Sequence, residues 1–162
     1  MKKYKDYLFS RCARNKGFTL IEMLIVITII ALLASTILVG MGGARAKARD
    51  SRRIADLHNV QNALELYYAK IGSYPVDNYN SSTDWNTFRT ILTGAGIGVN
   101  QVPKDPLNDA TRYYRYGGIT DGTNYVLGAQ LEQSDVALND DIDGTVNSID
   151  CADTNLVYCI TP

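Results

Sequence analysis

The stretch that decides the fold is 16-KGFTLIEMLIVITIIALLASTILVGM-41, in which Glu22 is the one ionisable side chain after Lys16. As a helix, the 24 residues from Phe18 to Met41 would be about 36 Å long at about 1.5 Å per residue, and the hydrocarbon core of a bilayer is about 30 Å thick. The stretch therefore predicts a membrane-spanning helix with a carboxylate near its start. That pattern favours assembly over catalysis.

Glu22 needs a cation if it is to stay ionised in a membrane. An ionised carboxylate at the bilayer centre costs about 2.5 to 3.5 kcal/mol, and less near the end of a span. A cut after Gly17 would give Phe18 a free α-ammonium group. We expect Glu22 of one copy to pair with that amine on a neighbouring copy when the helices pack in register.

The motif KGFTLIE at 16–22, the apolar helix behind it and LYYAKIGSYP at 66–75 resemble the type IV pilin and pseudopilin precursors. The resemblance implies that a membrane-embedded aspartyl prepilin peptidase cleaves between Gly17 and Phe18 on the cytoplasmic side and methylates the new Phe18 amine. It also implies partners: other copies of the chain, a membrane platform protein and an assembly ATPase. Beyond Pro75 the expected fold depends on sequence patterning alone.

Two other interpretations of the N-terminus stay open. Residues 1–17 carry six Lys or Arg against one Asp, as a secretory signal would, but the apolar run exceeds the usual core of about 7 to 15 residues. The second interpretation is a plain single-pass membrane anchor in which Glu22 has no function in assembly. The glycine at position 17, directly before Phe18, counts against it. We expect the N-terminus inside, although a second basic cluster follows the span. That cluster is expected to bind acidic heads or lipid phosphates, or to be a solvated helix face: Arg45, Lys47, Arg49, Arg52 and Arg53.

Length and charge define three segments. We predict a cleaved leader at 1–17, a transmembrane and assembly half of the helix at 18–43, and a periplasmic or extracellular head at 44–162 that includes the outer half of the helix. The 145 residues after the leader carry 10 Lys or Arg against 16 Asp or Glu. This acidic balance argues against nucleic acid as a ligand, since phosphate binding needs a positive surface.

The head is predicted to be α+β. An apolar stripe continues the helix to about Lys70, before Gly72 and Pro75, at spacings of three and four residues: Ile54, Leu57, Val60, Leu64, Tyr67 or Tyr68, and Ile71. A short helix is expected near 85–92, capped by Ser82, Thr83 or Asp84. Strands are expected at 112–116 and 124–132, joined as a hairpin, with a third at 156–160. The sequence thus predicts a long helix packed on a small antiparallel sheet, a pilin-like lollipop.

The cysteines divide by position. Cys12 lies in the leader, whereas Cys151 and Cys159 lie close together in the exported part, where we expect a disulfide that contributes about 2 to 3 kcal/mol. A metal site at these thiols would need more ligands than two cysteines and the single His58 supply. No Ser or Cys is spaced to use His58 as a base, so the sequence does not predict an enzyme.

Residues 139–150 follow the spacing of a calcium-binding loop. Two positions depart from that pattern, with Asn139 in place of the first Asp and Asp150 in place of the bidentate Glu, and a solvated acidic turn is the alternative. The major pseudopilins of type II secretion resemble this chain here too, in that they hold calcium in a C-terminal loop. No cofactor is required otherwise. The expected ligands are Asn139, Asp141, Asp143, the Thr145 carbonyl and Asp150.

These observations predict a structural subunit of a type IV pilus. It would be held in the cytoplasmic membrane by one span, processed, and polymerised into a cell-surface or periplasmic filament. The alternative is the major pseudopilin, of the G type, of a type II secretion system. An alternative of another class is a membrane-anchored module whose head binds calcium or another ligand.

Overall fold

A computed structural model describes residues 17–162, and the leader residues before Gly17, Cys12 included, lie outside the described residues. Helix α1, Leu20–Ile71, has 52 residues, which confirms the predicted long N-terminal helix. The chain forms two compact units that divide between Met41 and Gly42, within α1.

The first unit is the apolar part of α1. All of its residues from Gly17 to Ile37 are exposed, and 20–37 is the one segment among the described residues that is long and apolar enough to cross a membrane. Its hydroxyl groups are satisfied within the helix: Thr28 Oγ1, Ser35 Oγ and Thr36 Oγ1 donate to backbone carbonyls three or four residues earlier at 2.7–2.8 Å. This arrangement suits a hydrocarbon environment, where no water is available as a partner.

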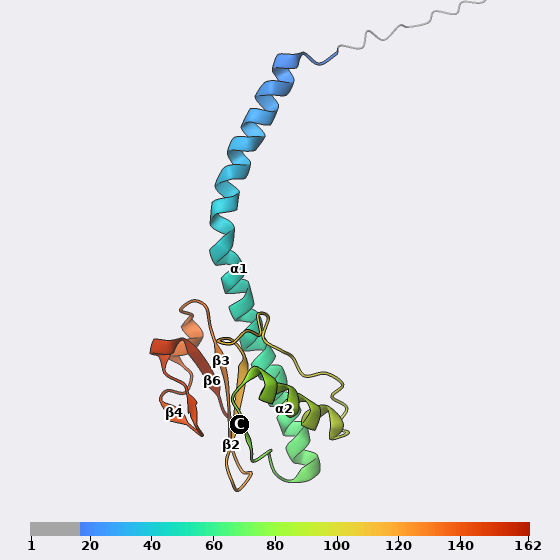
Figure 1. Ribbon diagram of the computed structural model, residues 1–162, viewed down its shortest axis with the longest axis vertical. Helices are drawn as coiled ribbons and strands as arrows, with labels where there is room; N and C mark the ends of the chain where they lie inside the picture. Colours follow the sequence, from blue (N-terminus) through green and yellow to red (C-terminus); the bar gives the residue numbers. More distant parts are fainter. Residues whose placement is uncertain (1–16) are drawn as a thin grey trace, which may run out of the picture. The chain divides into compact units, whose positions relative to one another are not determined.

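The second unit, the head, contains the rest of α1 and all the strands (Figure 1). Four strands form an antiparallel sheet in the order β1-β2-β3-β6, and β4 and β5 form a separate hairpin. In chain order the remaining elements are β1 (Asn78–Tyr79), α2 (Ser82–Gly94), β2 (Tyr114–Gly118), β3 (Tyr125–Gln130), η1 (Val136–Asn139), β4 (Thr145–Val146), β5 (Ile149–Asp150), η2 (Asp153–Asn155) and β6 (Val157–Ile160).

The core of the head is apolar and rich in aromatic side chains. Strand β2 alternates, so that the Tyr114 and Tyr116 side chains are buried while Arg115 is on the other face. The Tyr116 ring stacks on Phe88 of α2 at 4.5 Å between ring centroids. Along α1, three members of the predicted stripe are fully buried, and Ile71, at its end, is exposed. The fully buried members are Leu57, Val60 and Leu64.

The loop between α1 and β1 is fixed by a close approach to β2. A Cβ at Gly118 would lie 2.2 Å from the Pro75 carbonyl oxygen, so only glycine fits there. The Tyr116 hydroxyl also donates to that carbonyl at 2.7 Å. These contacts hold the end of α1 against the sheet edge where β1 pairs with β2.

The predicted α+β fold is confirmed, with differences in detail. The strand predicted at 112–116 begins at Tyr114, while the third predicted strand forms as β6 and pairs with β3. The cap of α2 is Ser81, whose hydroxyl accepts from Asp84 N at 3.0 Å, so the expected cap at 82–84 was wrong by one residue or more. Two-residue strands β1, β4 and β5 were not predicted, because such short strands carry no alternation.

Candidate functional site

The predicted cleavage site lies in accessible backbone. Gly17 and Phe18 precede the start of α1, have no regular secondary structure and are exposed. A Cβ built on Gly17 would meet no atom within 4 Å among residues 17–162, so the described part of the chain does not demand glycine there. A requirement for Gly17 would come from a processing enzyme.

Glu22 already has hydrogen-bond partners within its own chain. Its Oε2 accepts from Thr19 N at 2.8 Å and from Thr19 Oγ1 at 2.7 Å, while Glu22 N donates to Thr19 Oγ1 at 3.2 Å. Thr19 precedes the first helical residue, so the two residues form a reciprocal capping box at the N-terminus of α1. The motif Thr-x-x-Glu is visible in the sequence, but this function of Glu22 was not predicted.

The apolar part of α1 presents its side chains to the surroundings on every side. Phe18 is 77% exposed and Leu20 84%, and the large aliphatic side chains as far as Ile37 are all at least 47% exposed. Fully burying one such side chain is worth about 1.5–3 kcal/mol. A continuous surface of this size marks a membrane or protein contact.

A buried ionic network joins α1 to the rest of the head. The fully buried Arg53 guanidinium donates to Asp105 at 2.6 and 3.1 Å, to Asp50 at 2.7 Å and to Glu132 at 2.7 Å. Arg49 donates to both oxygens of Glu132, at 2.7 and 2.6 Å. Burial lowers the pKa of Arg53, but the hydrogen bonds to Asp105 and Glu132 outweigh this and raise it.

The network bears on the alternatives that the sequence left open for the second basic cluster. Of the five basic residues after the span, Arg49 and Arg53 bind carboxylates of their own head instead of lipid phosphates or solvent. The sequence concealed this because Asp105 and Glu132 lie 52 and 79 residues further along the chain from Arg53.

An acidic cluster lies beside the last strand. Carboxylate oxygens of Asp141, Asp143 and Asp153 all lie within 4.8 Å of one another. Asp141 Oδ2 accepts from Cys159 N at 2.7 Å, while Asp141 Oδ1 and Asp153 Oδ1 are buried and have no hydrogen-bond partner among the described atoms. Burial raises the pKa of Asp141, and the nearby Asp153 and Asp143 raise it further, against the hydrogen bond from Cys159 N.

This cluster differs from the predicted calcium set. Asn147 and Ser148 have φ of 48° and 66°, and two successive residues with positive φ favour a tight hairpin turn. Strands β4 and β5 therefore pair, Thr145 lies opposite Asp150, and Asp150 accepts from Asn155 Nδ2 at 2.7 Å. Asn139 is exposed at the end of η1.

The structure thus joins Asp141 and Asp143 of the predicted set to Asp153. Asp153 lies outside the twelve-residue window, so a motif search had no signal for it.

The predicted disulfide forms beside this cluster. Cys151 and Cys159 are bonded, with their Cα atoms 5.7 Å apart. Cys159 N holds Asp141, and Asp153 follows Cys151 by two residues. The bridge therefore links the segment that carries Asp153 to the strand that binds Asp141.

Comparisons with known proteins agree with the N-terminal features. Residues 12–38 match the family described as the prokaryotic N-terminal methylation motif. The chain is 35% identical over 65 residues to the type II secretion system core protein G of Escherichia coli (strain K12), a match that covers 40% of this chain and 45% of that protein. It is 29% identical over 105 residues to the core protein G of Vibrio cholerae serotype O1, covering 65% of this chain and 60% of that one.

The chain is also 44% identical over 59 residues to the type IV wide pilus major component PilA4 of Thermus thermophilus, covering 36% of this chain and 45% of that protein. The chain thus spans less than two thirds of each of these relatives. No solved structure matches the chain at a significant level. The matches confirm the resemblance to type IV pilins and type II secretion pseudopilins, and do not favour one over the other.

Proposed function

We propose that this chain is the precursor of a filament subunit, and specifically of a type IV pilus subunit. It would be cut between Gly17 and Phe18, methylated at Phe18 and polymerised through the apolar part of α1. The observation that carries the proposal is the exposed apolar helix at 20–37, in whose first turn Glu22 forms a capping box with Thr19, directly after an accessible cleavage site.

The first step would change charge without changing the helix. Cleavage after Gly17 leaves Thr19 and Glu22 in the chain, so the capping box survives, and it adds an ammonium group at Phe18. Glu22 would then exchange its Thr19 contacts for the Phe18 amine of a neighbouring copy, which neutralises a charge that is costly in lipid. Packing of the exposed aliphatic side chains between copies would add to the stability of the filament.

The remaining partners follow from the same scheme. A prepilin peptidase would process the chain, and a membrane platform protein with an assembly ATPase would extract subunits into the growing filament. The chain would cross the cytoplasmic membrane once with its N-terminus inside. The exposed 20–37 segment and its internally bonded hydroxyls support the membrane location.

The alternative is a major pseudopilin of a type II secretion system. Seven relatives, at 29–36% identity, carry the name core protein G of the type II secretion system, which supports this alternative. Deletion of the gene separates the two. Loss of surface pili with normal protein secretion supports the pilus subunit, whereas loss of secretion without loss of pili supports the pseudopilin.

Calcium binding by the head is a second proposal, at Asp141, Asp143 and Asp153. It is supported by the two buried carboxylate oxygens that lack partners, since unpaired buried carboxylates are costly and calcium prefers oxygen ligands. The melting temperature of the head should rise with added calcium, and Asp153→Asn should remove that rise. If a chelator leaves the melting temperature unchanged, the head does not bind calcium. That result would also exclude the alternative of a membrane-anchored calcium-binding module.

Mass spectrometry of the native N-terminus tests the main proposal most directly. The expected chain starts at Phe18 and carries one methyl group, and electron microscopy should show filaments that contain it. A chain that keeps residues 1–17 in the membrane at steady state, with no filaments, would contradict the proposal.

A further inference from the structure

The charges of the head are divided between two regions of the chain. No lysine or arginine follows Arg115, so the C-terminal part is uniformly acidic. The acidic side chains in that part are Asp121, Glu132, Asp135, Asp140, Asp141, Asp143, Asp150 and Asp153.

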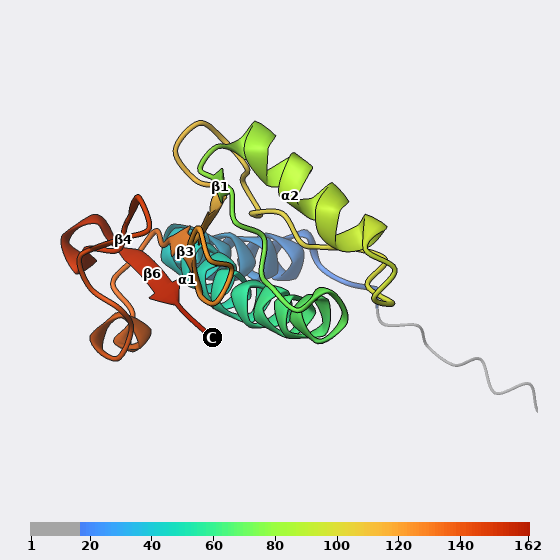
Figure 2. The ribbon, with the colours of Figure 1, turned by 90° about the horizontal axis from the view of Figure 1, so that it is seen from below.

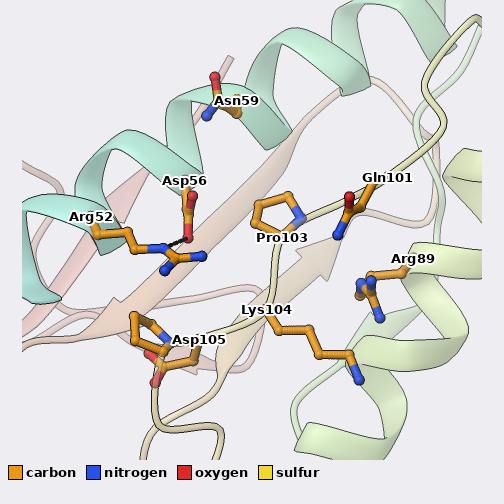
Figure 3. Close-up of a pocket in the computed structure, with 9 residues that line it drawn as sticks. Arg52, Asp56, Asn59, Arg89, Gln101, Pro103, Lys104 and Asp105 are labelled. Carbon is orange, nitrogen blue, oxygen red and sulfur yellow. Dashed lines mark ion pairs between the residues drawn. The ribbon is translucent and has the colours of Figure 1, made fainter.

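A pocket of about 660 Å³ on the other side of the head is lined by three cations. They come from three different segments: Arg52 from α1, Arg89 from α2 and Lys104 from the loop before β2 (Figure 3). Pro103 and Pro106 add apolar surface to the wall. We call this the cationic pocket.

The carboxylates at the cationic pocket do not neutralise it. Asp105 is already held by Arg53 and by two backbone N–H groups, at 2.8 and 3.1 Å. Asp56 accepts from the Tyr114 hydroxyl at 2.7 Å and forms only a long ion pair with Arg52, at 3.6 Å.

The other two cations keep their charge. Arg89 Nε donates to the uncharged Val102 carbonyl at 2.6 Å. Within residues 17–162, Lys104 Nζ has no carboxylate at ion-pair distance, and it is exposed. The cationic pocket therefore has positive charge available for an acidic group.

The acidic side of the head carries a short turn at 135–140, which we call the acidic turn. It consists of η1 with Asp135 before it and Asp140 after it. Val136 at its tip is 75% exposed, and Asp140 is exposed and forms no ion pair with residues 17–162. The turn thus presents an apolar side chain beside the half-buried Asp135, whose Oδ1 accepts from Ala137 N at 3.1 Å, and ahead of the exposed carboxylate of Asp140.

The acidic turn and the cationic pocket cannot meet within one head. Figures 1 and 2 place η1 (orange) and α2 (green) on opposite sides of the head, with α1 and the sheet between them. A contact between two different surfaces of the same chain is heterologous: it repeats from copy to copy, and it forms a ring where the rotation closes and an open helical filament where it does not.

We propose that the acidic turn of one copy docks in the cationic pocket of the next copy. The carboxylates of Asp135 and Asp140 pair with Arg52, Arg89 or Lys104, while Val136 packs on the two prolines. This inference rests on the proposed filament function and adds a head-to-head contact to it. Charges at such an interface orient the partners and make the contact dependent on salt.

A charge swap between Lys104 and Asp140 tests the contact in the full-length chain in its own membrane. Filaments sheared from cells are measured by immunoblot and electron microscopy for the variants Lys104→Glu, Asp140→Lys and the double variant. Each single reversal should lower the yield about fivefold or more, which corresponds to about 1 kcal/mol per contact. The double variant should recover most of the wild-type yield, because it restores opposite charges.

Two controls separate this contact from other causes. Lys47→Glu reverses an exposed cation of α1 outside the pocket and should leave the yield unchanged. Cells that express Lys104→Cys and Asp140→Cys chains together should form a disulfide-linked dimer under mild oxidation, which either variant alone should not form. Both surfaces are exposed, and fluorescence of the buried Trp85 reports whether each variant folds.

The outcomes are distinct. Wild-type filaments with normal yields from both single reversals and no cross-linked dimer would overturn this inference and leave the proposed function standing. Absence of wild-type filaments would overturn both. Normal filaments together with weaker binding of inorganic phosphate by Lys104→Glu would show a small-anion site in place of the docking contact.

Discussion

Replacing Arg53 by methionine should unfold the head at much lower denaturant concentration. The Arg53 side chain is fully buried, and its loss would leave the carboxylates of Asp105 and Asp50, which are 1% and 2% exposed, without their cation. Removing one partner of a buried ion pair costs about 3–5 kcal/mol. Arg53→Lys should cost less, because it keeps the charge and loses only the forked geometry of the guanidinium group.

Arg49→Met is the matched control. The Arg49 side chain is 31% exposed and has Glu132 as its ion-pair partner, which would still be bound by Arg53. Loss of the Arg49 side chain should lower the free energy of unfolding by about 1 kcal/mol.

Urea unfolding of the full chain in detergent measures these differences. The fluorescence of Trp85, the single tryptophan and fully buried in the head core, follows the transition. With a slope of about 2 kcal/mol per M, the Arg53→Met midpoint should fall by about 2 M and that of Arg49→Met by about 0.5 M. Equal urea midpoints for Arg53→Met and Arg49→Met would refute the argument that the buried ion pairs of Arg53 stabilise the head more than the partly exposed ion pair of Arg49.

Three further predictions concern the head and the assembly segment. The partners Arg49 and Arg53 lower the pKa of Glu132 from its ordinary value of 4.5 to about 2. The ionised Glu132 therefore stabilises the head fully above pH 4.5, and this contribution should be lost as the pH falls from about 4.5 to about 2. Glu132→Gln should flatten that part of the pH dependence of the urea midpoint. Glu22→Ala should leave processing intact but prevent filament growth, whereas Thr19→Ala, which keeps the charge and removes the cap at a cost of about 1 kcal/mol, should only lower the filament yield. Gly17→Trp should block processing, visible as a retained leader by mass spectrometry, although a Cβ at Gly17 would meet no atom of residues 17–162 within 4 Å.

The sequence was most informative where the pattern is local. The apolar run after Phe18 and the three-four spacing of Leu57, Val60 and Leu64 predicted α1 and its buried face, because a helix brings near neighbours in sequence together. The β2–β3 hairpin followed from strands rich in tyrosine and valine joined by a loop with glycine. The disulfide followed from two cysteines close together in an exported segment.

Features that combine distant segments were not predictable. The burial of Arg53 depends on carboxylates from the loop before β2 and from the end of β3, which the fold alone brings together. The acidic cluster includes Asp153 because the turn at Asn147 and Ser148 pairs β4 with β5, and loop spacing gives no sign of that. Glu22 was interpreted only as an assembly residue, although Thr19 makes it a helix cap as well.

The hydroxyl groups of Thr28, Ser35 and Thr36 all donate to carbonyls of their own helix, so between Met23 and Ile37 no hydroxyl hydrogen is left to donate to a neighbour. Rods with such a surface can slip past one another by a helical turn while keeping most of their van der Waals contact. Their axial alignment would then depend on what lies at the two ends, a single carboxylate at one and the folded head at the other. A fibre built in this way would stretch under load by sliding, with no backbone hydrogen bond broken.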